Sequence, residues 1–314
     1  MTAGVTDLAA HVDPRTPGPT GTGHDLVDLD ALRAELRSLG DVVVAFSGGA
    51  DSAFLAWVAT DTLGAGRVLC VTAVSPSLAP EELDDCRALA AEWDLRHVEV
   101  ATDELADPSY AANDGSRCYH CKASLMAALG PIVSAAGPTA TVVLGVNLDD
   151  LADHRPGQSA ATERGAVFPL VAAEFTKADV RSWSRLLGLR TWDKPAAACL
   201  ASRVPYGTRV TFATLDSVAR AESGLRALGF RQLRVRHYGD AARIEVPTDE
   251  LATVVEEREA ICGVVHAAGY RYVTLDLDGF RSGNLNDSLG TTGHGDPSPR
   301  DPQTANTGTT EATP

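Results

Sequence analysis

The sequence predicts an α/β protein with a doubly wound parallel sheet, followed by a smaller C-terminal domain of the α+β class. Three observations lead to this fold class. Apolar β-branched runs alternate with helical patterns from Asp41 to about Leu189, a glycine-rich loop joins the first run to the helix after it, and a different order of strands and helices begins near Val210. Regular alternation of strands and helices is typical of a parallel sheet that is covered by helices on both faces.

The strands of the first domain are short runs rich in valine and threonine. We expect them at Val42–Ser47, Val68–Ser75, His97–Thr102 and Thr139–Asn147, with helices near 51–63, 80–93, 121–136 and 176–188. Ligands of such sheets bind beyond the carboxyl ends of the strands. We therefore expect Ser47, the loop after Thr102 and the Asp149-Asp150 pair to meet at one edge of the sheet.

The second domain has its own pattern, which contains two strands without a helix between them. We expect a helix at 212–228, strands at Gln232–His237 and Arg243–Val246, a helix at 248–267 and a strand at Tyr270–Leu277. The predicted domains span 25–200 and 201–282. Residues 1–24 and 283–314 are rich in Gly, Pro, Thr, Ser and Asp, so we expect disordered tails there.

Composition excludes several classes of protein. The 314 residues, 44% hydrophobic and 22% charged, are enough for a sizeable core. No apolar run approaches the roughly 18 residues of a membrane span, and the first residues lack the basic and then apolar order of a signal peptide. We therefore expect a cytoplasmic protein that makes no contact with a membrane.

The net charge of -15 argues against nucleic acid as a partner. The C-terminal tail contributes only four acidic residues and one arginine, a balance of -3, so the folded part of the chain is itself acidic. An acidic surface repels a polyanion such as DNA or RNA. We expect a small-molecule ligand instead.

The segment Ser47-Gly48-Gly49-Ala50-Asp51-Ser52 has the composition of a phosphate-binding loop. Two glycines after a strand let the backbone turn tightly, and the free amide groups and dipole of the next helix favour an anion. Ser47 and Ser52 offer hydroxyl donors, and Asp51 suits the Mg²⁺ that accompanies ATP. No lysine follows the glycines, which argues against a P-loop kinase or GTPase.

This hexapeptide resembles the signature of the PP-loop ATP pyrophosphatases. The resemblance implies a Rossmann-like fold and cleavage of ATP to AMP and pyrophosphate, with transfer of the AMP to an acyl or carbonyl oxygen. It implies the reaction type and leaves the substrate open.

The six cysteines divide into two groups. In a reducing cytoplasm they are thiols rather than disulfides. Cys70, Cys86 and Cys262 lie in apolar segments and are expected to be small core residues. Cys118 and Cys121 form a C-x-x-C pair at a loop-to-helix boundary, where two thiolates on one turn could bind a single metal ion. The pair alone is an incomplete metal site, because zinc and iron clusters need further ligands.

Cys199 is the candidate third member of that site. It lies in a proline-containing loop between the two domains, with Lys194 before it and Arg203 after it. Apolar neighbours alone would suggest a buried cysteine. Positive charge close by favours the thiolate, which is the nucleophilic form of the side chain.

At this point the chain resembles the ATP-dependent sacrificial sulfur transferases (LarE-type) of nickel-pincer nucleotide cofactor synthesis, over about residues 28 to 287. The resemblance rests on an ordered set of motifs. They are 47–52, 117–122, 145–157, 194–207, 222–236, 242–245 and 274–283.

The resemblance implies that ATP adenylates a carboxylate of pyridinium-3,5-dicarboxylate mononucleotide and that a sulfur nucleophile then displaces AMP to give a thiocarboxylate. Two rounds convert both carboxylates. In members with one cysteine at the position of Cys199, that residue gives up its sulfur and becomes dehydroalanine. In members with three cysteines, a four-iron four-sulfur cluster is implied, and Cys118, Cys121 and Cys199 match that pattern. Three thiolates would also suit zinc.

Four charged residues of the second domain are further candidates. Arg234 and Arg236 alternate on a strand and share one face, where two guanidinium groups could hold the substrate phosphate. The alternative is a solvated strand face. Glu222 and Glu245 match family positions near that site and are candidate Mg²⁺ ligands, although exposed carboxylates often have no function.

The resemblance also implies a homo-oligomer and contact with other proteins of nickel-cofactor biosynthesis. Two other functions stay open. A PP-loop tRNA thiolation enzyme would share the glycine loop and the cysteines, but it should carry a basic face or an RNA-binding module, and this acidic chain shows neither. A non-enzymatic ATP-binding module would leave Cys199, Arg234 and Arg236 unexplained.

Overall fold

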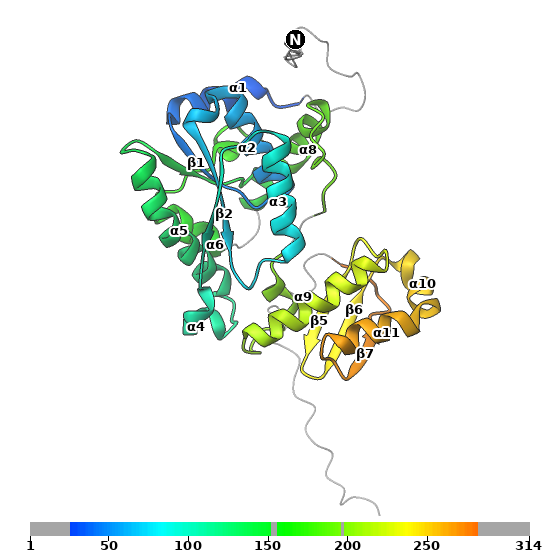
Figure 1. Cartoon of the computed structure of the whole chain (residues 1–314). Helices are drawn as coiled ribbons and strands as arrows, with labels where there is room; N and C mark the ends of the chain where they lie inside the picture. The colour runs from blue at the N-terminus through cyan, green and yellow to red at the C-terminus, as the bar shows by residue number, and fades with distance from the viewer. Residues whose placement is uncertain (1–25, 152–155, 196–197, 282–314) are drawn as a thin grey trace, which may run out of the picture.

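The first unit is a four-stranded parallel sheet between two layers of helices, as expected from the sequence (Figure 1). The structure is a computed structural model that describes residues 26–151, 156–195 and 198–281. The predicted tails, 1–24 and 283–314, lie outside the described residues, as do 152–155 of the 145–157 motif. The strand order is β3-β2-β1-β4, and all neighbours are parallel. The strands are β1 (Val42–Ala45), β2 (Val68–Val74), β3 (His97–Ala101) and β4 (Thr141–Val143).

Alternation along β1 sends its side chains into two separate cores. Val42 and Val44 pack with one set of helices, and Val43 packs with another on the opposite face. The first face is covered by α1 (Leu29–Leu39), α2 (Ala50–Leu63), α3 (Pro80–Glu92), α7 (Pro169–Ala172) and α8 (Lys177–Leu186). The second face is covered by α5 (Arg117–Ala136) and α6 (Pro156–Thr162). The short helix α4 (Pro108–Ala111) precedes α5.

The second unit is a three-stranded sheet with helices packed against it (Figure 1). Its order is β5-β6-β7, with an antiparallel β5–β6 pair and a parallel β6–β7 pair. Its elements are α9 (Phe212–Ala227), β5 (Arg234–Tyr238), β6 (Ala241–Glu245), α10 (Leu251–Glu256), α11 (Arg258–Ala267) and β7 (Tyr272–Leu275). The core of this unit also contains Leu200 from the preceding loop and Tyr110 from α4. The mixed sheet agrees with the predicted α+β class.

Two elements differ from those expected. The helix predicted at 248–267 is broken into a 3₁₀ turn at Thr248–Glu250, α10 and α11, because Glu257 leaves the helical region with φ -88° and ψ 15°. Helix α5 begins at Arg117 rather than near 121, since Asp114 accepts hydrogen bonds from the backbone N–H and hydroxyl of Ser116 and so turns the chain into the helix. Both cysteines of the C-x-x-C pair are therefore helical.

Gly145 brings the end of β4 against the start of α2. A Cβ atom at this position would lie 2.8 Å from backbone atoms of Asp51 and Ser52. Only glycine permits such a close approach without moving the backbone. This contact joins the 145–157 motif to the glycine loop at the carboxyl edge of the sheet. Among the described helices, none combines the length and the apolar character needed to cross a bilayer.

Candidate active site

The glycine loop runs from the end of β1 into the first turn of α2. Gly48 has a φ of 67°, a conformation that favours glycine, and Gly49 is the N-cap of α2 without a side-chain cap. The hydroxyl oxygens of Ser47 and Ser52 lie 3.0 Å apart, and Ser52 donates to the Gly49 carbonyl oxygen at 3.2 Å. The serines close the loop on itself, and the first amide groups of α2 have no side-chain cap. This arrangement suits an anion such as pyrophosphate.

Helix α3 and Lys194 support this loop from the other side. A Cβ atom on Gly48 would lie 2.9 Å from the sulfur of Cys86, so the loop backbone packs directly on α3. The Lys194 Nζ donates to the Gly48 carbonyl oxygen at 3.1 Å, to Glu82 at 2.8 Å and to Asp85 at 2.6 Å. No lysine directly follows the glycines in the sequence. Lys194, which is 146 residues from Gly48 in the chain, contacts the loop instead. Its three donors are used by a carbonyl and two carboxylates.

Asp51 faces a second carboxylate at the end of β4. Its Oδ1 accepts a hydrogen bond from the Asn147 side chain at 3.1 Å. Burial raises the pKa of Asp51, and the nearby charge of Asp150 raises it further. Asp150 itself is bound by the Lys177 ammonium at 3.2 Å. Its neighbour Asp149 accepts from the backbone N–H of Lys177 instead, at the first residue of α8.

Asp51 and Asp150 form a donor pair of the type that Mg²⁺ uses. Magnesium is commonly held by one or two carboxylates together with substrate phosphates and water. The part of the chain that the structure describes contains no group of three or more His, Cys, Asp or Glu side chains placed to hold a metal ion. Phosphate oxygens would therefore have to complete the coordination.

The C-x-x-C pair lies on the first turn of α5, and Cys199 lies just before a 3₁₀ turn at Leu200–Arg203. All three are free thiols; Cys118 and Cys199 are exposed and Cys121 is half-buried. Burial raises the pKa of Cys121 to about 12, and the nearby Cys199 contributes to that increase. The sequence-predicted thiols are thus brought into one region, although Cys199 is 78 or more residues from the C-x-x-C pair in the chain.

The three thiols do not form a ligand set as they are placed, because the described residues contain no metal-binding group. The donor chemistry of three cysteines is that of an iron–sulfur cluster or of zinc. The geometry required for coordination is absent from the described residues.

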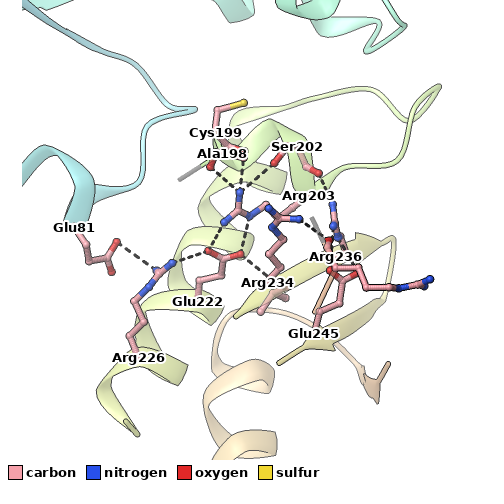
Figure 2. Close-up of polar contacts among 12 residues, drawn as sticks. Glu81, Ala198, Cys199, Ser202, Arg203, Glu222, Arg226, Arg234, Arg236 and Glu245 are labelled. Carbon is pink, nitrogen blue, oxygen red and sulfur yellow. Dashed lines mark hydrogen bonds and ion pairs between the residues drawn. The ribbon is translucent and has the colours of Figure 1, made fainter. Parts of the chain in front are cut away.

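Hydrogen bonds from both units hold the segment around Cys199. The Leu200 N–H donates to the carbonyl oxygen of Ser77, which follows β2, at 2.8 Å. The Arg203 Nη1 donates to the carbonyl oxygens of Ala198 at 2.7 Å and Cys199 at 3.2 Å. Figure 2 shows the Cys199 sulfur pointing away from this guanidinium group. The backbone at Cys199 is fixed while its thiol stays exposed.

Glu222 on α9 binds several donors at once (Figure 2). Its two oxygens accept from Nε and Nη2 of Arg203 at 2.8 Å and 3.0 Å, in a two-point ion pair. They also accept from Arg226 at 3.0 Å and from the Val235 N–H at 3.0 Å. The Glu222 side chain is 0% exposed. A buried carboxylate of this kind needs such neutralising partners.

Glu245 on β6 has an equivalent role toward Arg236 on β5. The Arg236 guanidinium binds it at two points, both 3.0 Å, and donates to the Ser202 carbonyl oxygen at 2.7 Å. Arg243 adds a contact to Glu245 at 3.1 Å. Arg236 therefore connects the second sheet to the Cys199 segment.

Arg234 is buried, and the described residues form no ion pair with it. Its guanidinium donates to the Arg281 carbonyl oxygen at 3.2 Å and lies 4.5 Å from the ring centroid of Phe280. Burial lowers its pKa, and the charges of Arg236 and Arg203 lower it further. An anion bound here would relieve this repulsion.

The structure shows the surroundings of three sequence-predicted ligands of the second unit. Glu222 and Glu245 were candidate Mg²⁺ ligands, but in the structure both are buried and bind guanidinium groups. The reason is electrostatic, because a carboxylate surrounded by arginines is already neutralised. Arg236 was a candidate phosphate ligand, and its guanidinium is held by Glu245 and Ser202. Arg234 keeps the greater capacity for an anion.

Several residues of the site were not assigned a role from the sequence. Arg203 and Lys194 had been noted only as positive charges near Cys199, and Ser77 had not been singled out. Their partners come from other elements of the fold, and neither spacing nor residue type indicates such pairings. The sequence signal that could have indicated these contacts is the presence of charged residues, Lys194 and Arg203, on both sides of Cys199.

The chain is similar to a known family model and to known proteins. The family model of NAD synthase matches residues 29–119. The chain is 39% identical over 258 residues to the pyridinium-3,5-bisthiocarboxylic acid mononucleotide synthase of Lactiplantibacillus plantarum, which covers 82% of this chain and 93% of that protein.

Two uncharacterised proteins are also similar. One, from Synechocystis sp., is 46% identical over 260 residues, which is 82% of this chain and 96% of that protein. The other, from Methanocaldococcus jannaschii, is 26% identical over 241 residues, which is 77% of this chain and 91% of that protein.

Replacing Asp51 with Asn should raise the free energy of unfolding at pH 7. Folding raises the pKa of this carboxyl group, so its ionised form destabilises the folded state. The advantage of Asp51→Asn should shrink as the pH falls toward the ordinary value of 3.8. Urea unfolding across that pH range measures the difference. The exposed Asp249, changed to Asn, is the control and should alter the free energy of unfolding by no more than about 0.5 kcal/mol. Equal stability of Asp51→Asn and wild type at pH 7 would contradict the prediction.

Replacing Glu222 with Gln should lower the free energy of unfolding by about 3–5 kcal/mol, because Arg203 would keep a buried charge without its partner. Denaturant unfolding of both proteins measures this change. The matched control is Glu259→Gln, whose carboxylate is 90% exposed beside Arg258, with an expected change within about 0.5 kcal/mol. If the two variants were equally stable, the Glu222 ion pair would not have the importance assigned to it.

Proposed function

The chain belongs to the family of the pyridinium-3,5-bisthiocarboxylic acid mononucleotide synthases, and on this premise we propose that it is an ATP-dependent sulfur transferase. Its substrate is pyridinium-3,5-dicarboxylate mononucleotide, whose carboxylates it adenylates and converts to thiocarboxylates in nickel-pincer nucleotide biosynthesis. The observation that carries the proposal is the position of Cys199. Lys194, which precedes Cys199 in the sequence, donates a hydrogen bond to Gly48 of the glycine loop. Leu200, which follows Cys199, donates one to Ser77 in the loop after β2.

In the first half-reaction a substrate carboxylate oxygen attacks the α-phosphorus of ATP. The bond between the α- and β-phosphates breaks, and pyrophosphate leaves with the electron pair. The amide groups of the loop containing Ser47, Gly48, Gly49 and Ser52 would hold the pyrophosphate oxygens. Asp51, together with Asp150, would hold the Mg²⁺ that neutralises the phosphates. The product is a mixed anhydride of the carboxylate and AMP.

In the second half-reaction the Cys199 thiolate attacks the activated carbonyl carbon. A C–S bond forms, the C–O bond to AMP breaks, and AMP leaves with the electron pair. Where Cys199 itself is the sulfur source, a base takes its Cα proton and the Cβ–S bond breaks, so that the thiocarboxylate leaves with the electron pair and dehydroalanine remains. The exposure of this thiol on a fixed backbone supports the role.

Arg234 is the better supported of the two proposed phosphate ligands. It is a buried cation without an ion-pair partner among the described residues, and it lies on the same strand as Arg236, which contacts the Cys199 segment. A guanidinium group binds phosphate oxygens at two points. Arg236 would add positive potential while it remains bound to Glu245.

A four-iron four-sulfur cluster on Cys118, Cys121 and Cys199 is the finer part of the proposal. Its support is three free thiols in one region, close enough for Cys199 and Cys118 to affect the pKa of Cys121. Such a cluster would supply sulfide, so that Cys199 would not be consumed. The coordination geometry is missing from the described residues, and the steps above do not use the cluster.

The same proposal includes a cytoplasmic location, where the six free thiols stay reduced, and assembly into a homo-oligomer that meets other proteins of nickel-cofactor biosynthesis. Large exposed apolar side chains on the second unit, Phe212 at 65% and Leu277 at 80%, support a further interface.

The activity is tested by pyrophosphate release. The pyridinium dicarboxylate nucleotide should stimulate release from ATP, and Cys199→Ala should keep that release while thiocarboxylate formation falls to background. Mass spectrometry of the nucleotide product measures the second step. Cys262→Ala, in the second unit, is the control and should leave both steps unchanged. Absence of stimulation would count against the assigned substrate, and thiocarboxylate formation by Cys199→Ala would show that another group attacks.

The sulfur source is tested by iron and sulfide analysis of protein purified without oxygen. A cluster predicts iron, acid-labile sulfide and a broad visible absorption that Cys118→Ala loses and Cys262→Ala retains. Colourless, iron-free wild-type protein would instead indicate that Cys199 is the sulfur source and is consumed in each transfer.

A further inference from the structure

Arg117 is a buried arginine beside the thiols, and no carboxylate pairs with it in the described part of the chain. It is the first residue of α5 and is 3% exposed. Its Nη1 donates to the side-chain oxygen of Asn113 and, at 2.9 Å, to the Ala201 carbonyl oxygen. Its guanidinium carbon lies 5.4 Å from the ring centroid of Tyr206. Arg117, the residue before Cys118, therefore contacts Ala201 and Tyr206, which follow Cys199 in the sequence.

The ionisable groups that influence the pKa of Arg117 are thiols and phenols. Burial lowers its pKa, while Cys199, Cys118 and two tyrosines raise it, with a net increase. The other buried arginines near Cys199 differ, because Arg203 and Arg236 are each neutralised by a glutamate. Arg117 is therefore a fixed positive charge at the sulfur-bearing residues, and no carboxylate among the described residues forms an ion pair with it.

Asn113 completes the connection. It is 0% exposed and has a φ of 58°, a strained conformation that asparagine tolerates better than most residues. Its side-chain nitrogen lies within hydrogen-bonding distance of the carbonyl oxygens of Val204 at 3.3 Å, Pro205 at 2.8 Å and Thr208 at 2.8 Å. Its own carbonyl oxygen accepts from the Gly207 N–H at 3.0 Å. Every polar side-chain atom of Asn113 thus binds either Arg117 or the 204–208 loop.

We propose that Asn113 and Arg117 are positioning residues for sulfur transfer, which hold the Cys199 segment at a fixed distance from the turn that carries Cys118 and Cys121. Arg117 lies in the turn that carries the C-x-x-C pair and directly contacts the segment after Cys199. Asn113 binds the Arg117 guanidinium and also the 204–208 loop that follows Cys199. The proposal rests on the proposed function, since it assigns these residues to the second half-reaction. Adenylation takes place at the glycine loop, which neither residue contacts in the described structure.

The test uses the full-length protein and measures two rates separately: pyrophosphate release with the pyridinium dicarboxylate nucleotide, and thiocarboxylate formation in a single turnover. In Arg117→Met and Asn113→Gly we expect the first rate to stay within about threefold. The second should fall by about 10²-fold, the typical consequence of displacing a reacting group by about 1 Å. Glycine at 113 keeps the positive φ and removes only the side chain. Arg117→Lys keeps the charge and should restore part of the transfer rate.

The control is Arg164→Met. Arg164 also contacts the first turn of α5, where its guanidinium lies 5.7 Å from the Tyr119 ring, but it does not touch the Cys199 segment. Both rates should match wild type. Equal loss of the two rates in the Asn113 and Arg117 variants would overturn the proposal, and so would unchanged transfer.

A second measurement does not depend on activity. A short thiol-specific cross-linker should join the exposed Cys118 to the exposed Cys199 in a Cys121→Ser background, and the yield should fall at least fivefold when Asn113 is also changed to Gly. An unchanged yield would overturn the positioning role. If wild type releases no pyrophosphate, the proposed function fails, while the cross-linking yield still decides whether Asn113 sets the spacing of the thiols.

Discussion

The ion pair between Glu222 and Arg203 determines where Cys199 lies. Arg203 uses two nitrogens on the carboxylate and its third on the carbonyl oxygens of Ala198 and Cys199. Both side chains are almost inaccessible, at 0% and 7%, so neither charge can be satisfied by water. Glu222 also accepts from the Val235 N–H and thereby fixes β5 relative to the same segment. The buried Glu222 carboxylate thus holds α9, β5 and the loop that carries the Cys199 thiol together.

The arginines around this carboxylate would allow an acidic protein to take the anionic substrate that is proposed for it. The chain has a formal charge of -15, which repels a dicarboxylate nucleotide at long range. In the second unit, however, five arginines lie around Glu222 and Glu245, with Glu81 and Asp276 as further partners at the margin: Arg203, Arg226, Arg234, Arg236 and Arg243. This cluster of arginines gives the region next to Cys199 a local positive charge that the net charge of the chain does not indicate.

Local patterns predicted the fold well, and tertiary pairings account for what they missed. The valine runs of β1 and β2 and the glycine loop were identifiable because periodicity and turn chemistry depend on neighbours in the sequence. The broken helix at Glu257 was missed because its apolar positions continue through the break. Glu222 was interpreted as a metal ligand because a carboxylate has the same sequence signature whether it binds magnesium or arginine. The contact of Lys194 with Gly48 had no local signal, since 146 residues separate them.

The side chain of Asn113 limits how this protein can be divided. Asn113 lies just before α5 of the first unit, and its side-chain nitrogen donates to carbonyl oxygens of Pro205 and Thr208, in the loop that leads into the second unit. Tyr110 from the first unit packs in the core of the second. A cut between residues 200 and 201 would separate a buried amide from its acceptors and expose Leu200 and Tyr110. The two halves are consequently poor modules for recombination. A chimaera that joins this C-terminal unit to another nucleotide-binding unit would need to carry residues 110–117 with it.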